Sequence, residues 1–360
     1  MRKFIITICS FVLTCAIVLS GCSCANTSPL SFSTNFAGTA ENAANLESSY
    51  LETLNYTVSY NKNYNASLKL DETIADLFTL DYNGTYTSIF KGDIVSFPEF
   101  IDTDISFEGD KHYIRTELNL KVTVNDKEYQ DGIISEVYFY SAGQAFAPVY
   151  SKVISKNTMV AVSTSEKVLS AVQRLYLYET KYYEDEIITN KLAYNGENVA
   201  DIDIYNLDQT LLTPFEEQTS SDYTLKQAID NVQLIFAIRN INLDVEKTYN
   251  LPTVSPTYGA PKSLTITNQD ELTYAFTNTF TYNGTPYENL KMTAKNMTFV
   301  IGGTSNVGTE QNVIVQKAKS DDFPYYNALP VEYAESLSEM SSFNRLGALV
   351  YKLTDATVTH

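Results

Sequence analysis

The sequence predicts an α+β fold that consists mainly of antiparallel β-sheet with two to four helices, and it leaves open an arrangement of two similar β-rich halves. Three observations support this prediction. Many short segments alternate between apolar and polar residues, the tripeptide Tyr-Asn-Gly occurs three times, and few segments carry apolar residues at helical spacing. Alternation with a period of two is typical of strands that are buried on one face.

The strand signal comes from seven segments rich in Val, Ile, Thr, Tyr and Phe, which are residue types that favour strands. These segments are residues 56–60, 117–124, 136–141, 200–206, 263–267, 275–282 and 312–316. Because each segment has one polar face, we expect the strands to pair mostly in antiparallel fashion.

The three Tyr-Asn-Gly tripeptides are predicted to form the tips of β-hairpins. They are Tyr82-Asn83-Gly84, Tyr194-Asn195-Gly196 and Tyr282-Asn283-Gly284, and Asn125-Asp126 is a related pair. Asn and Gly both tolerate the positive φ that a two-residue type I′ turn requires. We therefore interpret these tripeptides as turns rather than as binding loops.

Two segments carry the main helical signal. Residues 163–166 have the sequence of a capping box, and the apolar residues that follow fall on one helical face, which predicts a helix over 165–180. A second helix is predicted from Asp222 or Thr224 to Phe236, because apolar residues recur there at spacings of three and four. Short helices near 331–341 and 41–53 are weaker predictions.

A faint internal repeat is the reason for considering two similar halves. Residues 105–143 align without gaps on residues 263–301, which places Asn125 on Asn283. The alternative is chance, because any two strand-rich segments share the same alternation. The predicted organisation comprises a signal peptide (1–21), a tether (22–45), a β-rich domain that ends in a helix (46–183) and a second β-rich domain with one or two helices (184–360).

The first residues have the pattern of a secretory signal peptide. Arg2 and Lys3 precede an apolar run from Phe4 to Leu19, and small residues end the run before Cys22. This run of about 16 residues is short for a helix that crosses the bilayer, which needs roughly 20. An uncleaved membrane anchor is the alternative interpretation.

The end of this run, Leu19-Ser20-Gly21-Cys22, resembles the lipobox of bacterial lipoproteins. The resemblance implies that Cys22 is diacylglycerylated, that the chain is cut before it, and that the mature protein is anchored in the cell membrane facing outward. Two acyl chains on one cysteine give stable anchoring. Ser23 leaves the choice of bacterial membrane open, and residues 25–40 have the small polar composition of a flexible tether.

The charge of the mature chain argues against nucleic acid as a partner. Cleavage leaves 23 basic residues (25 less Arg2 and Lys3) against 43 acidic ones, a net charge of −20. A nucleic-acid binder needs a basic surface that displaces phosphate counterions. The same negative charge favours a body that stands away from an anionic membrane surface.

The sequence contains no standard catalytic signature. Its two histidines, His112 and His360, form no metal-binding pair, and we expect His112 at the surface. The two S-x-x-K matches, at 59–62 and 88–91, lie in strand-like segments, and no serine lies in a G-x-S-x-G turn. The acidic stretches 102–110 and 201–208 lack the spacing of a calcium loop. No cofactor or metal is therefore predicted, and the prediction is a protein that is not an enzyme.

These observations favour a membrane-anchored binding module without catalytic activity. The excess of tyrosine, as in the pair Tyr138 and Tyr140, suits contact with glycans or proteins, although tyrosine also simply fits strands. The expected partner is an extracellular or envelope protein, a glycan or a small ligand. The alternatives are a carrier of an apolar ligand and the solute-binding lipoprotein of an importer.

The lipobox predicts the effect of a single substitution. Cys22→Ser removes the thiol that would take the lipid, so the variant should lose its acyl mass and leave the membrane fraction. Cell fractionation combined with intact-mass measurement tests this. An unchanged mass and an unchanged membrane fraction would show that Cys22 is not the anchor.

Overall fold

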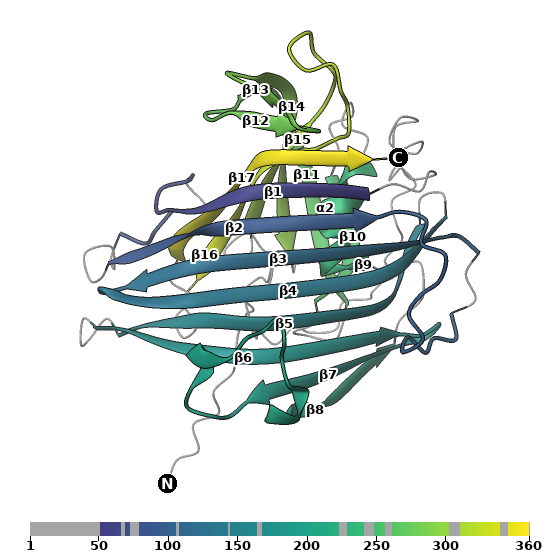
Figure 1. Ribbon diagram of the computed structural model, residues 1–360, viewed down its shortest axis with the longest axis vertical. Coiled ribbons are helices and arrows are strands. Elements are labelled where there is room, and N and C mark those ends of the chain that lie inside the picture. Colours follow the sequence, from purple (N-terminus) through teal and green to yellow (C-terminus); the bar gives the residue numbers. More distant parts are fainter. Residues whose placement is uncertain are drawn as a thin grey trace.

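The computed structural model contains a sheet of seventeen strands, nearly all of them paired in antiparallel fashion (Figure 1). The structure describes residues 51–65, 69–72, 79–105, 108–142, 145–163, 168–222, 229–240, 248–255, 261–301, 310–338 and 345–359. The prediction that antiparallel sheet dominates the fold is confirmed.

The strands are β1 (Leu51–Asn61), β2 (Leu80–Lys91), β3 (Asp110–Val124), β4 (Lys127–Ala142), β5 (Ala145–Ser163), β6 (Val168–Tyr182), β7 (Glu186–Tyr194), β8 (Leu212–Asp222), β9 (Ile229–Asp230), β10 (Thr248–Val254), β11 (Pro261–Ala275), β12 (Phe280–Tyr282), β13 (Thr285–Tyr287), β14 (Lys291–Ile301), β15 (Glu310–Gln316), β16 (Pro330–Ser338) and β17 (Arg345–Thr359). The helical segments are η1 (Val199–Asp201), η2 (Gln209–Leu211), η3 (Asn231–Gln233), α2 (Leu234–Ala237) and η4 (Ile238–Asn240).

The first and last strands of the sheet pair with each other. From Leu51↔Thr359 onward, β1 runs antiparallel to β17, while its other edge pairs with β2. From this seam, β2 to β8 follow one another as a meander on one side, and β16, β15, β14, β11 and β10 follow on the other. Figure 1 shows β2 to β8 in front, with β10 and β16 behind them.

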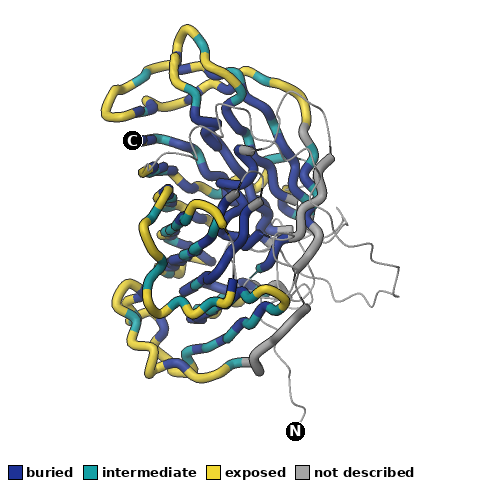
Figure 2. The backbone as a smooth tube through the Cα atoms, turned by 90° about the vertical axis from the view of Figure 1, so that its right-hand side faces the viewer, coloured by how far each residue is buried: buried dark blue, intermediate teal, exposed yellow. Residues whose placement is uncertain are grey.

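The sheet curls back on itself and encloses its inner face. The short strand β9 pairs in parallel with β10 and also lies against β5, which is far from β10 in the order of strands. Alternate residues of β1, β2, β3 and β17 point into one large apolar cluster on this inner face. Figure 2 shows the buried residues gathered in the middle of the molecule and the exposed ones mainly at strand ends and connections.

The prediction of an α+β fold with two to four helices is wrong. Over the described residues α2, four residues long, is the one α-helix, and the 165–180 and 331–341 segments contain the strands β6 and β16. Strand β6 is buried on both faces, because Tyr176 packs in the inner cluster while Leu175 and Leu177 pack in a second cluster outside. Apolar residues on both faces at 175–178 produced part of the spacing that looked like one side of a helix, whereas Val172, another of those positions, is 47% exposed.

The second predicted helix is present only in its last part, and the first ten residues of the 41–53 segment lie outside the described residues. The helical stretch Asn231–Asn240 consists of η3, α2 and η4. Its N-cap is Asp230, whose side chain accepts from the backbone N–H of Val232 while Gln233 completes a capping box. The start predicted at Asp222 or Thr224 is wrong for Asp222, which lies in β8, and Thr224 lies outside the described residues.

Two of the four predicted turns are confirmed. Asn125 and Asp126 have φ values of 46° and 67° between β3 and β4, and Asn283 and Gly284 have 48° and 77° between β12 and β13. By contrast, Asn83-Gly84 lies inside β2, and Asn195-Gly196 begins a long connection rather than a tight hairpin. Gly84 is needed there for space, since a Cβ would collide with the backbone carbonyl of Asn119.

The two regions of the proposed repeat both contain a turn of this kind. The turn at Asn125 joins β3 directly to β4, whereas the turn at Asn283 belongs to a small hairpin inserted between β11 and β14. The predicted boundary at 183/184 falls in the turn between β6 and β7, which pair in the same sheet. The division into two domains and the duplication remain predictions.

The helical stretch Asn231–Asn240 fills the space in front of the inner face, and we call it the plug. Its residues 231–239 are buried. The ring of Phe236 stacks on Phe90 of β2 at 4.1 Å and also contacts Phe139 and Phe146. A curved sheet must bury the apolar residues of its concave face against another element, and here that element is the plug, a segment of the same chain.

A buried ion pair ties the plug to the seam of the sheet. Arg239 Nη2 lies 2.8 Å from Glu52 Oε1, and Arg239 Nη1 donates to Glu52 Oε2 at 2.9 Å. Asn327 Nδ2 donates to the same Oε2 at 2.9 Å. Two parallel bonds between a guanidinium and a carboxylate fix geometry as well as charge.

Removing one partner of this pair should destabilise the fold strongly. Arg239→Met keeps most of the volume but leaves the Glu52 carboxylate buried without its cation, a change that costs about 3–5 kcal/mol. The matched control is Lys121→Met, because the Lys121–Glu128 pair is exposed at 42% and 57% and should be worth less than about 1 kcal/mol. Urea denaturation measures both, and equal losses would contradict a structural role for the buried pair.

Candidate functional site

A surface cleft of about 660 Å³ lies at the end of the sheet where the β3–β4 turn, the start of β6 and the connection after β7 meet. This volume is within the range of small-molecule sites. The cleft is lined by Lys127, Glu128, Tyr129, Gln130, Ala171, Val172, Gln173, Arg174, Asn195, Gly196, Glu197, Val199 and Ala200.

The lining of the cleft is polar and balanced in charge. It offers three side-chain amides, two cations, two carboxylates and one tyrosine ring. Lys127 Nζ lies 4.8 Å from the centre of the Tyr129 ring, and the Tyr129 hydroxyl donates to the Ala171 carbonyl at 3.4 Å. Amides and an aromatic face together suit a ligand that has hydroxyl groups and a weakly apolar face.

One amide of the cleft connects it to a buried carboxylate. Gln173 Nε2 donates to the Gln130 carbonyl and to Asp131 Oδ1, both at 2.8 Å. The ladder between β4 and β5 stops at Gly132↔Lys156. Beyond that point the Asp131 carboxylate accepts the Thr158 N–H at 2.6 Å and the Thr158 hydroxyl at 2.7 Å, so a side chain replaces the missing ladder bond.

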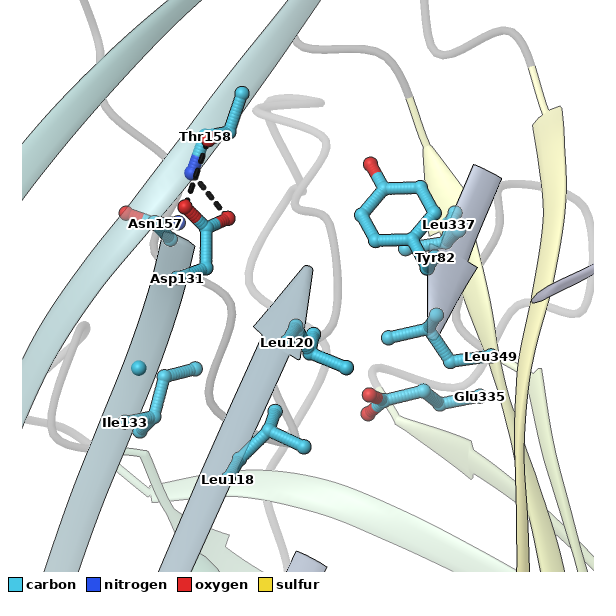
Figure 3. A pocket seen from close by; sticks show the side chains of 11 residues that line it. Tyr82, Leu118, Leu120, Asp131, Ile133, Asn157, Thr158, Glu335, Leu337 and Leu349 are labelled. Carbon is cyan, nitrogen blue, oxygen red and sulfur yellow. Dashed lines mark hydrogen bonds between the residues drawn. The ribbon is translucent and has the colours of Figure 1, made fainter. Parts of the chain in front are cut away.

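Behind Asp131, on the inner face, lies a small cavity of about 30 Å³. Figure 3 shows Asp131 and Asn157 on one side of it and Tyr82 and Glu335 on the other, with Leu118 and Leu120 between. Asn157 is 4% exposed, and neither its amide oxygen nor its amide nitrogen has a hydrogen-bond partner. A buried amide in this state usually indicates a bound water or ligand.

Glu335 belongs to a buried cluster of tyrosines. The Tyr351 hydroxyl donates to Glu335 Oε1 at 2.5 Å, and the rings of Tyr351 and Tyr333 stack at 3.9 Å. Tyr86 meets the Tyr351 ring edge-on at 5.5 Å. Burial raises the pKa of Glu335 to about 7, because the ionised form loses its hydration, and the bond from Tyr351 offsets only part of this.

The tyrosine pair singled out in the sequence packs under a loop. Tyr138 and Tyr140 lie on the outer face of β4, where Phe97 contacts them at 6.2 and 4.9 Å between ring centres. Both are half-buried in a satellite cluster. Their main role is therefore packing, which is the structural alternative considered for the tyrosine excess.

The expectation that His112 lies at the surface is wrong. Its side chain is fully buried, and its Nε2 lies 2.6 Å from the Ser141 hydroxyl. Because the Asp93 N–H donates to Nδ1 at 3.3 Å, the proton of the neutral ring belongs on Nε2, which then donates to Ser141. Burial also lowers the pKa of His112 to about 4. This tautomer cannot accept the Ser141 proton, so the pair is not a nucleophile and its base.

The remaining candidates give no catalytic or metal site in the part of the chain that the structure describes. Asp203 and Asp208 accept hydrogen bonds from their own turns, at Tyr205 and Thr210. Over the described ranges no three His, Cys, Asp or Glu side chains are grouped to hold a metal ion. The S-x-x-K stretch 59–62 lies at the end of β1, with its lysine just beyond the strand, and the stretch 88–91 lies on β2. The predicted lipidation site Cys22 lies outside the described residues.

Comparisons with known proteins assign no function to this chain. No family model matches it, and no curated protein matches it. Among solved structures, the crystal structure of a beta-barrel-like protein of domain of unknown function DUF1849 from Brucella abortus is similar over 86% of this chain and 98% of that chain, with 7% identity and a TM-score of 0.45. Within the described residues, no helix has both the length and the apolar character needed to cross a bilayer.

The cleft could not be found from local sequence motifs. Its lining comes from three segments that are each more than 20 residues apart in the chain. The one signal was Asn195-Gly196, and the sequence interpretation of this step as a hairpin tip was wrong. In the structure these two residues form part of the cleft wall.

The environment of Glu335 predicts a pH dependence of stability. A pKa raised from 4.5 to about 7 means that the folded state holds this proton more tightly. The contribution of this proton to stability is fully present below pH 4.5. It is lost between pH 4.5 and about 7, and at 1.36 kcal/mol for each unit of pKa shift the loss amounts to roughly 3 kcal/mol. Glu335→Gln stays neutral, so its stability relative to the unsubstituted protein should rise across that range. Urea titrations at several pH values test this, and a constant difference from pH 4 to 8 would contradict it.

Proposed function

We propose that this protein is an outward-facing, lipid-anchored binding module without catalytic activity, and that its ligand occupies the cleft beside the β3–β4 turn. The observation that carries the proposal is the cleft itself. It has the size of a ligand site and combines amides, balanced charges and one tyrosine ring. The anchor at Cys22 rests on the lipobox, which would place the cleft outside the cytoplasm.

A glycan or glycopeptide of the cell envelope is the ligand class that fits this lining best. The amide of Gln130 can donate and accept hydrogen bonds, as sugar hydroxyl and acetamido groups require. The Gln173 amide nitrogen already donates to Gln130 and Asp131, and that of Asn195 to Thr213, so these two side chains offer a ligand mainly their amide oxygens as acceptors. The ring of Tyr129 offers an apolar edge beside them. Cations and carboxylates in equal number suit a ligand that carries both charges, as a peptide-bearing glycan does.

The two alternative functions receive less support from the fold. A carrier of an apolar ligand needs a large apolar space, but the plug packs its aromatic ring directly against β2, and the cavity beside Asp131 measures about 30 Å³. An importer's binding protein usually has two α/β lobes with a cleft between them. The described strands instead form one predominantly antiparallel sheet.

Binding of peptidoglycan fragments tests this proposal. Soluble muropeptides and chitotetraose, which has related sugars without the peptide, serve as probes in isothermal titration with the full chain. Lys127→Ala should weaken the binding of at least one probe about tenfold, the loss expected for a hydrogen bond to a charged group. The matched control is Lys91→Ala, which removes a lysine that also lies over a tyrosine, Tyr113, but at the opposite end of β2 and β3.

The outcomes separate cleanly. Binding that falls in Lys127→Ala and persists in Lys91→Ala supports the cleft as the site. No binding of either probe would refute an envelope glycan as the ligand class. Equal losses in the two variants would place the binding surface elsewhere.

A further inference from the structure

The loop between β2 and β3, described over residues 92–105, leaves two large apolar side chains in solvent. Val95 is 95% exposed and Phe100 is 59% exposed, and these are the two highest values among the large apolar residues of the described ranges. Single exposed apolar residues are normal on a protein surface, whereas apolar residues grouped in one place mark a surface that contacts another body. We call this segment the β2–β3 loop.

Contacts with the sheet hold the β2–β3 loop in place. The Ile94 N–H donates to the Lys111 carbonyl at 2.8 Å. The rings of Phe97 and Phe100 both lie edge-on to Tyr138 of β4, with 6.2 and 6.5 Å between ring centres. Because the loop is fastened against the outer face of the sheet, the fold itself displays the exposed part of Phe100 and the neighbouring Val95 to solvent.

The β2–β3 loop lies at the end of the sheet from which the chain runs back to Cys22. Leu51, the first residue of β1, pairs with Lys91 at the end of β2 and with Thr359 at the end of β17. Figure 1 shows the arrowheads of β2 and β17 on the same side, at its right. Cys22 precedes Leu51 by 29 positions (51 less 22), and a flexible tether of this length has an r.m.s. span of about 30 Å. A bilayer that holds the predicted anchor is therefore within reach of this end.

Two lysines beside the exposed side chains suit a boundary between water and lipid. Lys111 Nζ donates to the Val95 carbonyl at 3.4 Å and lies 5.9 Å from the centre of the Phe97 ring. Lys91 Nζ lies 5.8 Å from the centre of the Tyr113 ring. Lysine side chains cover apolar groups with their stems while the ammonium stays in water. Both ammonium groups could therefore remain among hydrated head groups while the apolar side chains go deeper.

Acidic side chains of the same loop restrict the kind of lipid that it can approach. Asp93, Glu99, Asp102 and Asp104 are all exposed, and they outnumber the two lysines. An anionic membrane surface would repel them. The contact is therefore apolar in origin, and it suits lipids whose head groups carry no net charge.

We propose that the β2–β3 loop docks on lipid without net charge in the bilayer that holds the Cys22 anchor, with Val95 and Phe100 entering the boundary between head groups and acyl chains. The proposal rests on the proposed function, because the anchor is what brings this end of the sheet to a bilayer. Two side chains alone would bind lipid weakly. The tether makes their binding an intramolecular event, and the high effective concentration compensates for the small contact.

Docking of this loop would orient the binding cleft. The cleft lies at the opposite end of β3, beside the β3–β4 turn. Strand β3 has 15 residues, and at about 3.3 Å for each residue it spans about 50 Å. With the β2–β3 loop on the bilayer, the cleft would therefore stand well above the membrane and face the rest of the envelope.

Tryptophan substitution tests the contact, because the sequence contains no tryptophan. Phe100→Trp keeps an aromatic ring in the loop and provides a single emission signal. The matched control is Leu211→Trp, since Leu211 is 47% exposed and lies next to the start of β8, at the opposite end of the sheet. Each full-length chain is processed by the cell, purified from the membrane fraction and reconstituted in phosphatidylcholine vesicles. Half of the samples contain phosphatidylcholine brominated on its acyl chains, which quenches tryptophan, and flotation measures attachment to the vesicles.

Phe100→Trp should emit about twofold less light in the brominated vesicles, because side chains at a bilayer surface lie about 5–10 Å into the boundary between head groups and acyl chains. Leu211→Trp should emit equally in both kinds of vesicle. Adding Val95→Ser to Phe100→Trp removes one apolar contact at a fully solvated position, and it should weaken the quenching. Vesicles rich in phosphatidylglycerol should weaken it as well, because the loop is acidic.

The outcomes distinguish the docking from the anchor. If the protein floats with the vesicles and Phe100→Trp is quenched no more than Leu211→Trp, the docking is overturned and the anchor stands. If the protein has no acyl mass and does not float, the anchor is refuted and the docking is overturned with it. A blue shift of Phe100→Trp that grows with protein concentration in the absence of vesicles would assign the loop to a second copy of this chain, and would also overturn the proposal.

Discussion

A sheet that curls around its own inner face must fill the enclosed space, and the rest of this structure depends on how that filling is held. The plug supplies aromatic rings for the middle of the space, with Phe236 stacked on Phe90. Its Arg239 reaches Glu52 on the first strand of the sheet. The ion pair specifies where the plug sits, because apolar packing alone tolerates shifts of position that a two-bond charge contact does not.

The cleft and the inner cavity are neighbours separated by one side chain. Asp131 stands where β4 parts from β5, and it replaces a ladder bond by accepting from Thr158. Gln173 holds it from the side of the cleft, while Asn157 lies beside it in the cavity. A break in a sheet ladder leaves backbone groups that need partners, so such a place readily collects polar side chains. In this protein the break lies between the cleft and the inner cavity.

Local signals predicted the parts of the fold that local physics decides. Asn283-Gly284 and Asn125-Asp126 are turns because their positive φ suits these residues. The failures arose where tertiary packing decides. In β6 the neighbouring Leu175 and Tyr176 are buried on opposite faces of the strand while Val172 is exposed, so the apolar spacing that looked helical arises from the surrounding strands, which local sequence does not reveal. The strand β3 begins at Asp110, earlier than the segment 117–124 predicted from the sequence. His112 therefore alternates in step with Ile114 and Leu118 and lies on their buried face. The cleft and the cavity join residues that are distant in the sequence, and no spacing rule reaches that far.

The seam between β1 and β17 has a consequence for how the molecule is made. Tyr56 and Val58 find their partners at Leu353 and Tyr351, almost 300 residues later. During synthesis the first strand therefore has one edge without its native neighbour until β17 has left the ribosome. Contacts of such long sequence separation slow folding, since a large loop must close before they form. A nascent chain that cannot complete its sheet early stays open for longer, and that delay suits a polypeptide threaded through a translocation pore, as the predicted signal peptide requires.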